Sequence, residues 1–135
     1  MSRRVRTITQ RVLLPARPQQ VYDALTSAAR HAALTGAAAT GARRVGARFT
    51  AYDGYIMGVH RVLKPAALIV QDWWTTEWPE GASPSKLQIT LRNAKGGTEL
   101  KMVHSAVPAE QADSYRQGWI DYYWTPLQKY FKSRS

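Results

Sequence analysis

Cysteine is absent from the 135 residues of this sequence, and long hydrophobic runs are absent as well. The lack of cysteine excludes disulfides, zinc sites built on thiolates and catalysis by a thiol. The opening segment MSRRVRTITQRV carries charges without the apolar run of a signal peptide, and no segment approaches the roughly 18 apolar residues of a membrane-spanning helix. We therefore expect a protein without a membrane span, located in the cytoplasm.

Acidic residues are scarce, because nine Asp and Glu stand against 19 Lys and Arg, for a net charge of +10. A basic surface attracts nucleic-acid phosphates and anionic membranes. The basic residues, however, are spread from Arg3 to Arg134 and cluster only in SRRVR and at Arg43 and Arg44, without a nucleic-acid-binding motif. We therefore expect a solvated basic surface and no specific nucleic-acid partner.

Motifs for cofactors and metals are also missing. The sequence has no dinucleotide fingerprint, no phosphate-binding loop and no Gly-x-Ser-x-Gly nucleophile elbow. Its three histidines, His31, His60 and His104, fall in different predicted elements, and no carboxylate stands at metal-ligand spacing from them. We expect no cofactor, no metal and no assigned catalytic residue, and a binding protein is favoured over an enzyme.

What is present is the composition of an ordinary globular protein. Hydrophobic residues make up 44% and charged residues 21% of the chain, unlike the composition of a disordered protein. At 15.2 kDa the chain is large enough to bury about two-thirds of its unfolded surface. We expect a single domain covering residues 1–135.

Local patterning predicts one strand, two short helices and then a β-rich middle. Residues 6–14, RTITQRVLL, alternate as a strand does. Pro18 suits the first turn of a helix, Ser27 can cap a second short helix, and Gly36 can stop it. Turn signals such as Asp53-Gly54 separate the strands that follow. These candidate strands lie near residues 46–52, 55–64 and 67–78, and on both sides of the NAKGGT turn.

The segment after Pro108 predicts one long amphipathic helix. Apolar residues at helical offsets from Trp119 form a continuous stripe: Ala112, Tyr115, Tyr122, Tyr123, Pro126, Leu127 and Tyr130. Aromatic side chains of this size bury about 150 to 250 Å² each, so the helix is expected to hold the sheet together. Pro126 lacks an N–H group, and we predict a bend near Tyr122 and Tyr123.

Six strings in this order resemble the helix-grip, or START-like (SRPBCC), superfamily. They are VYDALTS, LTG, GARFTAYDGYIMG, LKPAALIVQDW, GGTELKMVHSAVP and GWIDYYWTPLQKYF. Within that superfamily the strings are similar to the subfamily named after the C-terminal domain of the heat-shock protein 90 ATPase activator. The resemblance covers about residues 5 to 131. It implies an α+β fold in which a curved antiparallel sheet, with two short helices after strand 1, wraps around a long C-terminal helix.

The resemblance also implies a cavity between the sheet and the C-terminal helix. In many relatives such a cavity receives an apolar molecule, so binding of a hydrophobic or aromatic small molecule, lipid-like or polyketide-like, is the expected function. One alternative is a co-chaperone or stress-response regulator like the heat-shock protein 90 ATPase activator. A second alternative is an enzyme of the polyketide cyclase type. A chaperone partner and a homodimer are both considered, and fold by itself does not decide among these functions.

Strand alternation and the helical stripe together predict the residues that face the interior. The candidate ligand-binding residues are Phe49, Tyr55, Met57, Trp73, Leu87, Ile89, Leu100, Met102, His104, Tyr115, Trp119, Tyr122 and Tyr123. If these side chains interdigitate fully they form only a core, whereas a ligand needs a cavity of about 300 Å³ or more.

Two polar residues and two tryptophans have alternative interpretations. His104 either bonds a tyrosine or a carbonyl within the core, or with Glu77 at the cavity mouth could transfer protons. Trp74 and Trp78 either form an exposed patch for a protein contact or a dimer, or pack against the first short helices or the EGASPS loop.

Overall fold

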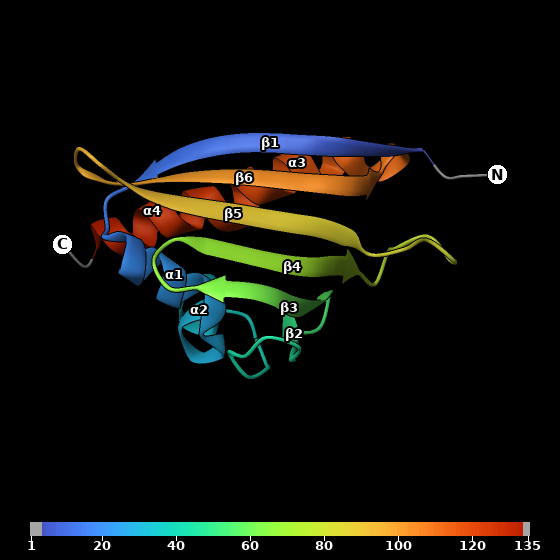
Figure 1. Ribbon diagram of the computed structural model, residues 1–135, viewed down its shortest axis with the longest axis horizontal. Coiled ribbons are helices and arrows are strands. Elements are labelled where there is room, and N and C mark those ends of the chain that lie inside the picture. The colour runs from blue at the N-terminus through green and yellow to red at the C-terminus, as the bar shows by residue number, and fades with distance from the viewer. Residues whose placement is uncertain (1–3, 134–135) are drawn as a thin grey trace.

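The computed structural model describes residues 4–133 and contains one six-stranded antiparallel sheet with helices on one face (Figure 1). The spatial strand order is β1-β6-β5-β4-β3-β2, so the first and last strands of the chain are neighbours. The strands are β1 (Val5–Leu14), β2 (Arg48–Ala51), β3 (Ile56–Lys64), β4 (Leu68–Thr75), β5 (Ser85–Ala94) and β6 (Gly97–Pro108). The helices are α1 (Pro18–Thr26), α2 (Ala28–Thr35), the 3-10 turn η1 (Ala109–Gln111), α3 (Ala112–Trp119), the π-helical segment η2 (Ile120–Trp124) and α4 (Thr125–Lys132).

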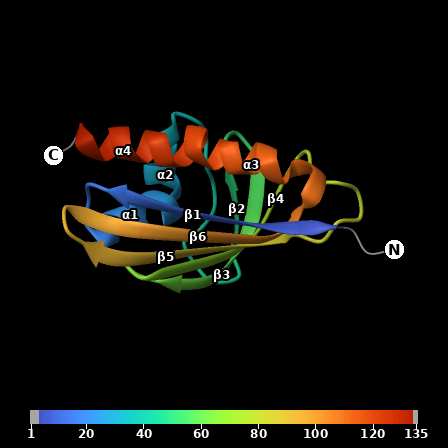
Figure 2. The ribbon, with the colours of Figure 1, turned by 90° about the horizontal axis from the view of Figure 1, so that it is seen from above.

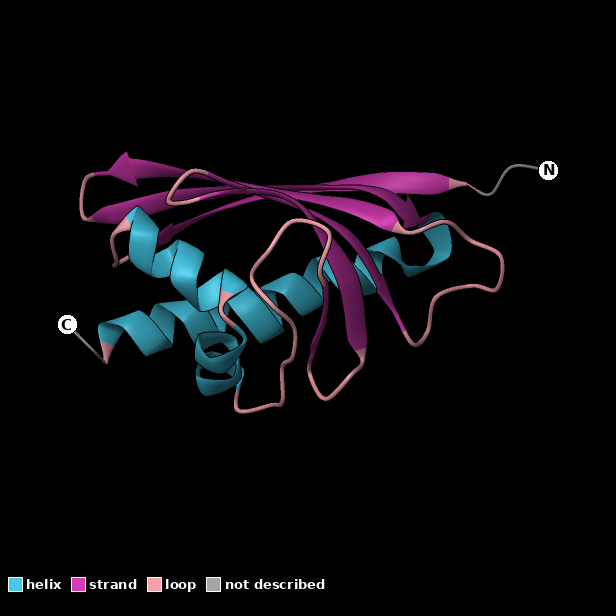
Figure 3. Cartoon of the chain, turned by 60° about the horizontal axis from the view of Figure 1, so that its bottom comes forward, coloured by secondary structure: helices cyan, strands magenta, loops and turns pink. Residues whose placement is uncertain are grey.

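The predicted helix-grip architecture is confirmed. Figure 2 shows α3, η2 and α4 as one rod along the sheet, and Figure 3 shows the curved sheet arching over the helices. Buried side chains from the sheet and the helices form one hydrophobic cluster, which includes Leu100, Met102 and Leu127 at 0% exposure. Within residues 4–133, no helix is long and apolar enough to cross a membrane.

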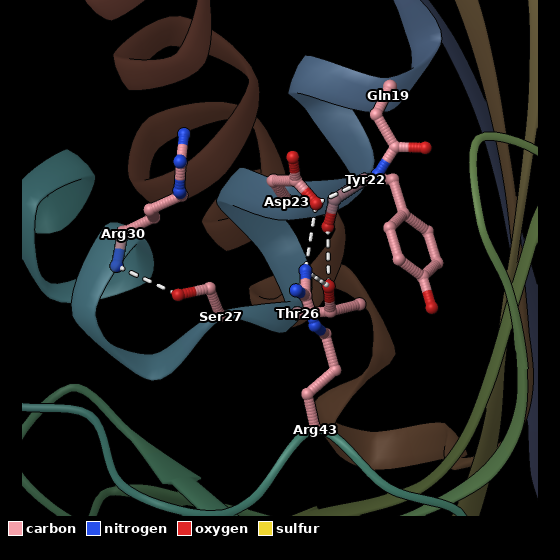
Figure 4. A network of polar contacts seen from close by, with 7 residues as sticks. All are labelled: Gln19, Tyr22, Asp23, Thr26, Ser27, Arg30 and Arg43. Carbon is pink, nitrogen blue, oxygen red and sulfur yellow. Dashed lines mark hydrogen bonds and ion pairs between the residues drawn. The ribbon is translucent and has the colours of Figure 1, made fainter.

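Polar contacts cap the second short helix and join the first one to the following loop (Figure 4). Ser27 ends α1 and caps α2, where its Oγ accepts a hydrogen bond from the Arg30 N–H at 3.4 Å. Asp23 on α1 accepts hydrogen bonds from Gln19 Nε2 at 2.9 Å and from Arg43 Nη1 at 2.7 Å. Arg43 therefore ties the loop between α2 and β2 back to α1.

The register of β3 corrects the prediction for Met57. Directly opposite residues on antiparallel strands share a face, and Trp73, which faces the interior, pairs with Gly58. Ile56, Gly58 and His60 are therefore the interior residues of β3, while Met57 pairs with Trp74 on the outer face. Alternation that starts at Tyr55 has the wrong phase, because Tyr55 belongs to the preceding turn and not to the strand.

Position 58 faces the interior and is occupied by glycine, because a side chain there would have no room. A Cβ at this position would lie 2.3 Å from Phe49 Cζ and 2.4 Å from the Asp72 carbonyl oxygen. The Phe49 ring covers Gly58 and stacks on His60, with 4.8 Å between ring centroids. A glycine gives no apolar signal in a strand pattern, which is why the interior face of β3 was missed.

The C-terminal helix is irregular where a bend was predicted. In η2 the hydrogen bonding is π-helical, and the Thr125 N–H bonds to the Ile120 carbonyl five residues earlier. A π turn holds one more residue than an α turn and shifts the buried stripe along the sequence. Tyr123 and Trp124 are buried, whereas Tyr122, which was predicted to lie in the stripe, is 60% exposed.

Candidate ligand cleft

A cleft of about 450 Å³ lies between the C-terminal helix and the β2-β3-β4 end of the sheet. Its volume falls within the range of roughly 300 to 1,000 Å³ that is typical of small-molecule sites. Its lining residues are Tyr52, Tyr55, Ile56, Trp73, Glu77, Ser114, Tyr115, Gly118, Trp119, Tyr122 and Tyr123. Trp73 and Trp119 are each 4% exposed and form the floor, while the exposed Tyr122 lies at the rim. The cleft is therefore open on one side and aromatic within.

The helix wall of the cleft consists of two neighbouring rows of residues, of which Tyr115, Trp119 and Tyr123 form the buried one. Ser114, Gly118 and Tyr122 follow one another at spacings of four, and residues four apart lie on the same helix face. Gly118 contributes space, because the nearest atom to a Cβ built there is Tyr122 Cδ2 at 3.9 Å. The centre of this wall is therefore shaped by a missing side chain.

The opposite wall is held in place by the turn before β3. Tyr52 and Asp53 have left-handed backbones, with φ angles of 51° and 60°. Asp53 stabilises the turn through its Oδ1, which accepts a hydrogen bond from the Ala38 N–H at 2.8 Å. The Tyr52 hydroxyl donates to the backbone carbonyl of Tyr122 and so joins the turn to the helix. Burial, with a smaller contribution from Tyr122, raises the pKa of Tyr52 to about 12, so this donor stays protonated.

Glu77 lies at the cleft mouth, as predicted, and its backbone is held on both sides. Its N–H donates to Thr75 Oγ1 at 3.2 Å, and its carbonyl accepts from Gln111 Nε2 at 2.8 Å. The Tyr115 hydroxyl connects the same two residues, 2.7 Å from Thr75 Oγ1 and 2.9 Å from Gln111 Oε1. Burial raises the pKa of Tyr115 well above its usual value, and the nearby Glu77 carboxylate adds to this shift.

His104 belongs to the core beneath the cleft and does not line it. Trp119 Nε1–H donates to His104 Nδ1 at 3.1 Å, so the neutral ring carries its proton on Nε2. Nε2 then donates to Ser85 Oγ at 2.8 Å, and the Ser85 hydroxyl donates to the Trp73 carbonyl at 2.6 Å. Burial lowers the pKa of His104 to about 3. His104 is therefore a core residue, but its partners are the Trp119 indole and the Ser85 hydroxyl rather than a tyrosine or a backbone carbonyl. Its ring has no nitrogen left to meet a guest.

His31 is a buried polar residue that the sequence pattern did not single out. Its Nε2 lies 2.9 Å from the Tyr123 hydroxyl, while its Nδ1 is buried without a hydrogen-bond partner. Burial lowers the pKa of His31 to about 4. The residue lines a smaller cavity of about 40 Å³, whose wall shares Trp73, Trp119 and Tyr123 with the cleft.

The structure divides the predicted site residues into four groups. Six line the cleft: Tyr55, Trp73, Tyr115, Trp119, Tyr122 and Tyr123. Three others line the smaller cavity: Phe49, Leu87 and Ile89. Leu100, Met102 and His104 are fully buried and line neither space, and Met57 lies on the outer face. Tyr52, Ile56, Ser114 and Gly118 were missed, because they lie in a turn, at a misassigned strand phase or beside the apolar stripe.

Trp74 and Trp78, whose environment was left open by the sequence, differ in what they pack against. The Trp78 ring lies 6.1 Å from Trp73 and 5.9 Å from Tyr115, and its Nε1 donates to the Ser83 carbonyl at 2.9 Å. The alternative of packing against the loop is therefore confirmed for Trp78, because β4 ends at Thr75 and strand alternation stops there. Trp74 lies half-buried on the outer face beside Met57.

Comparison with known proteins gives relatives at the levels of sequence and fold. The chain is 32% identical over 114 residues to the human activator of 90 kDa heat shock protein ATPase homolog 1, which covers 84% of this chain and 33% of the human protein. The chain thus spans about one third of the length of this curated relative. An HSP90 activator from Plasmodium falciparum superposes with a TM-score of 0.77 at 23% identity, covering 88% of this chain and 89% of that one. A protein from Mesorhizobium loti superposes with a TM-score of 0.79 at 20% identity, covering 96% and 98%.

These likenesses agree with a match to a whole family. The family described as Activator of Hsp90 ATPase homolog 1-like protein matches residues 15–132, which include all helices and five of the six strands. The chain belongs to this family.

Proposed function

We propose that this protein binds a small, largely apolar or aromatic molecule in the cleft between the C-terminal helix and the sheet. The observation that carries the proposal is an open space of about 450 Å³ in which seven of the eleven lining residues are aromatic. Aromatic side chains give large contact areas at low cost in conformational entropy. The family relationship supports the fold of this site and leaves its ligand open.

The walls of the cleft are organised before a guest arrives. The hydroxyl groups of Tyr52, Tyr115 and Tyr123 all have hydrogen-bond partners within the protein. Side chains that are already immobilised lose little entropy when a ligand binds. The aromatic walls are therefore suited to a guest that binds through its shape and its apolar surface rather than through hydrogen bonds to these hydroxyl groups.

Filling the cleft tests this proposal without removing any polar group. Gly118→Phe places a ring in the cleft from an open position on the helix wall, and Gly118→Ala is the matched control with a single added methyl group. The neutral fluorescent probe N-phenyl-1-naphthylamine should bind the unmodified protein, bind Gly118→Ala nearly as well, and bind Gly118→Phe at least about tenfold more weakly. Thermal unfolding of each variant checks that its fold is retained.

Two results would overturn the proposal. One is the absence of probe binding to the unmodified protein, and the other is unchanged binding to a folded Gly118→Phe variant. If the probe binds as expected, native mass spectrometry of protein isolated from its own host identifies a natural guest that co-purifies.

A second candidate function, regulation of a chaperone ATPase, is favoured by the 32% identity to a protein named as such an activator. Because this chain spans about one third of that relative, the activity of the whole relative does not transfer directly. The test is the ATPase rate of the host's 90 kDa heat-shock protein with and without this chain. An unchanged rate at saturating chain would rule this function out.

A further inference from the structure

The charge of the cleft is opposite to the charge of the protein. The chain carries a net charge of +10, yet no Arg, Lys or His within residues 4–133 lines the cleft. Within the same residues, Glu77 is the one charged residue of this lining. It has no ion-pair partner among residues 4–133, so its carboxylate is available to a guest.

Further exposed carboxylates lie close to lining residues along the chain. On the helix, Asp113 and Asp121 each precede a lining residue, and both are exposed. Asp121 accepts a hydrogen bond from Gln117 Nε2 at 3.0 Å and is thereby held in this row. In the loop after β4, the exposed Glu80 follows Glu77 by three residues. Glu77 is the carboxylate that lines the cleft itself, and these others are neighbours of lining residues along the chain.

The aromatic walls favour the same sign of charge in a guest. The face of an aromatic ring carries negative partial charge and attracts a cation, and tryptophan does so most strongly. Trp73 and Trp119 form the floor with their ring centroids 5.7 Å apart, and Tyr115 lies 5.4 Å from Trp73. An ammonium group near Glu77 would thus meet a carboxylate at the edge of a cleft that is lined by aromatic rings.

We infer that the guest of this cleft is a cation, namely an organic ammonium group on an apolar or aromatic body. The apolar body lies on Trp73 and Trp119, and the ammonium group lies at the mouth beside Glu77. This inference rests on the proposed function, because it names the chemical class of ligand for the same cleft. An anionic guest would lose its hydration, gain no basic partner from the lining and face the Glu77 carboxylate.

Three ligands that share a phenylmethyl group separate charge from shape. They are 2-phenylethylammonium, 2-phenylethanol and phenylacetate, which carry a positive charge, no charge and a negative charge at pH 7. Their binding is followed by the indole N–H resonances of Trp73 and Trp119 in ¹⁵N-labelled protein. We expect the ammonium ligand to bind roughly three- to tenfold more tightly than the alcohol, and phenylacetate to bind most weakly.

Glu77→Gln removes the charge and keeps the shape of the side chain. We expect this variant to bind the ammonium ligand about as weakly as the alcohol, and to bind the alcohol as the unmodified protein does. Glu80→Gln is the matched control, because Glu80 lies on the same loop outside the lining. It should leave the preference for the ammonium ligand nearly intact.

The outcomes distinguish this inference from the proposed function. If the alcohol or phenylacetate binds as tightly as the ammonium ligand, or if Glu77→Gln leaves all three affinities unchanged, the preference for cations is wrong. If none of the three ligands binds while N-phenyl-1-naphthylamine does, the inference is wrong and the apolar cleft remains. If the naphthylamine probe also fails to bind, both proposals fall.

Discussion

At the scale of single residues, the three histidines link the stability of the fold to pH. His31, His60 and His104 are all buried, and burial lowers the pKa of each ring. In the unfolded chain each ring would titrate near 6.5. A pKa that is lower in the folded state means that protons bind preferentially to the unfolded chain, so acid favours unfolding.

The free energy of unfolding should therefore fall as the pH drops below about 6.5. With pKa values of about 4 for His31 and about 3 for His104, both rings are still neutral in the folded protein at pH 5. At pH 5 each of these two histidines therefore lowers the free energy of unfolding by about 2 kcal/mol relative to pH 7, because only the unfolded form takes up the proton. Urea denaturation at pH 7 and pH 5 measures this loss.

A variant isolates the contribution of one ring. His31→Gln keeps a polar partner for the Tyr123 hydroxyl but does not titrate, so its stability should fall by about 2 kcal/mol less between these two pH values. An equal fall in the variant and the unmodified protein would contradict the assignment of a low pKa to His31.

At the scale of elements, the helix is joined to the cleft wall in the π-helical segment just before Pro126. Pro126 has no N–H to donate to the Tyr122 carbonyl four residues earlier in the chain. That carbonyl instead accepts the hydroxyl of Tyr52 from the turn before β3. The Tyr52 hydroxyl therefore supplies a hydrogen bond to a carbonyl that Pro126 cannot bond, and this contact joins the helix to the cleft wall.

A double-mutant cycle between Tyr52 and Pro126 tests this exchange. Tyr52→Phe should cost about 1 to 2 kcal/mol in the unmodified background, since it leaves the Tyr122 carbonyl without this partner. In a Pro126→Ala background the new N–H can bond to that carbonyl, and Tyr52→Phe should cost about 1 kcal/mol less. Unfolding in urea gives all four stabilities, and additive effects would show that the two residues are independent.

The sequence predicted which kinds of elements form more reliably than it predicted which residues of a strand face the interior. The first strand, the two short helices and the long terminal helix were predicted from local periodicity and capping residues and are present. The phase of β3 was wrong because the turn predicted at Asp53-Gly54 extends from Tyr52 through Tyr55, so that the strand begins only at Ile56. Gly58 concealed the interior face further, since its role depends on Phe49 from another strand.

At the scale of the whole molecule, the first strand and the last helix are bound together through Gln10. Its Nε2 donates to the Arg116 carbonyl at 3.0 Å, and its Oε1 accepts from Trp124 Nε1 at 2.7 Å. These contacts join residues more than 100 positions apart, and they close the fold around its core. Self-association and a cytoplasmic location stay predictions at this scale.

Removing this link should weaken the whole fold. Gln10→Leu has similar volume but loses both hydrogen bonds and leaves the Trp124 N–H without this partner, so we expect a loss of about 1 to 3 kcal/mol. The matched control is Gln88→Leu, the same change on the outer face of β5, with an expected effect within about 0.5 kcal/mol. Denaturation followed by tryptophan fluorescence measures both, and equal effects would remove Gln10 from this role.

Residue spacing by itself determined which elements form and which of their faces are apolar, because these properties depend on neighbours along the chain. It placed Trp73, Tyr115, Trp119 and Tyr123 correctly at the interface of sheet and helix. Only the tertiary structure decided that the two apolar faces stay apart near Gly118 and meet fully around Leu100. The curvature of the sheet and the pairing of distant strands set that separation, and they also leave Glu77 as the one charge that residues 4–133 bring to the cleft.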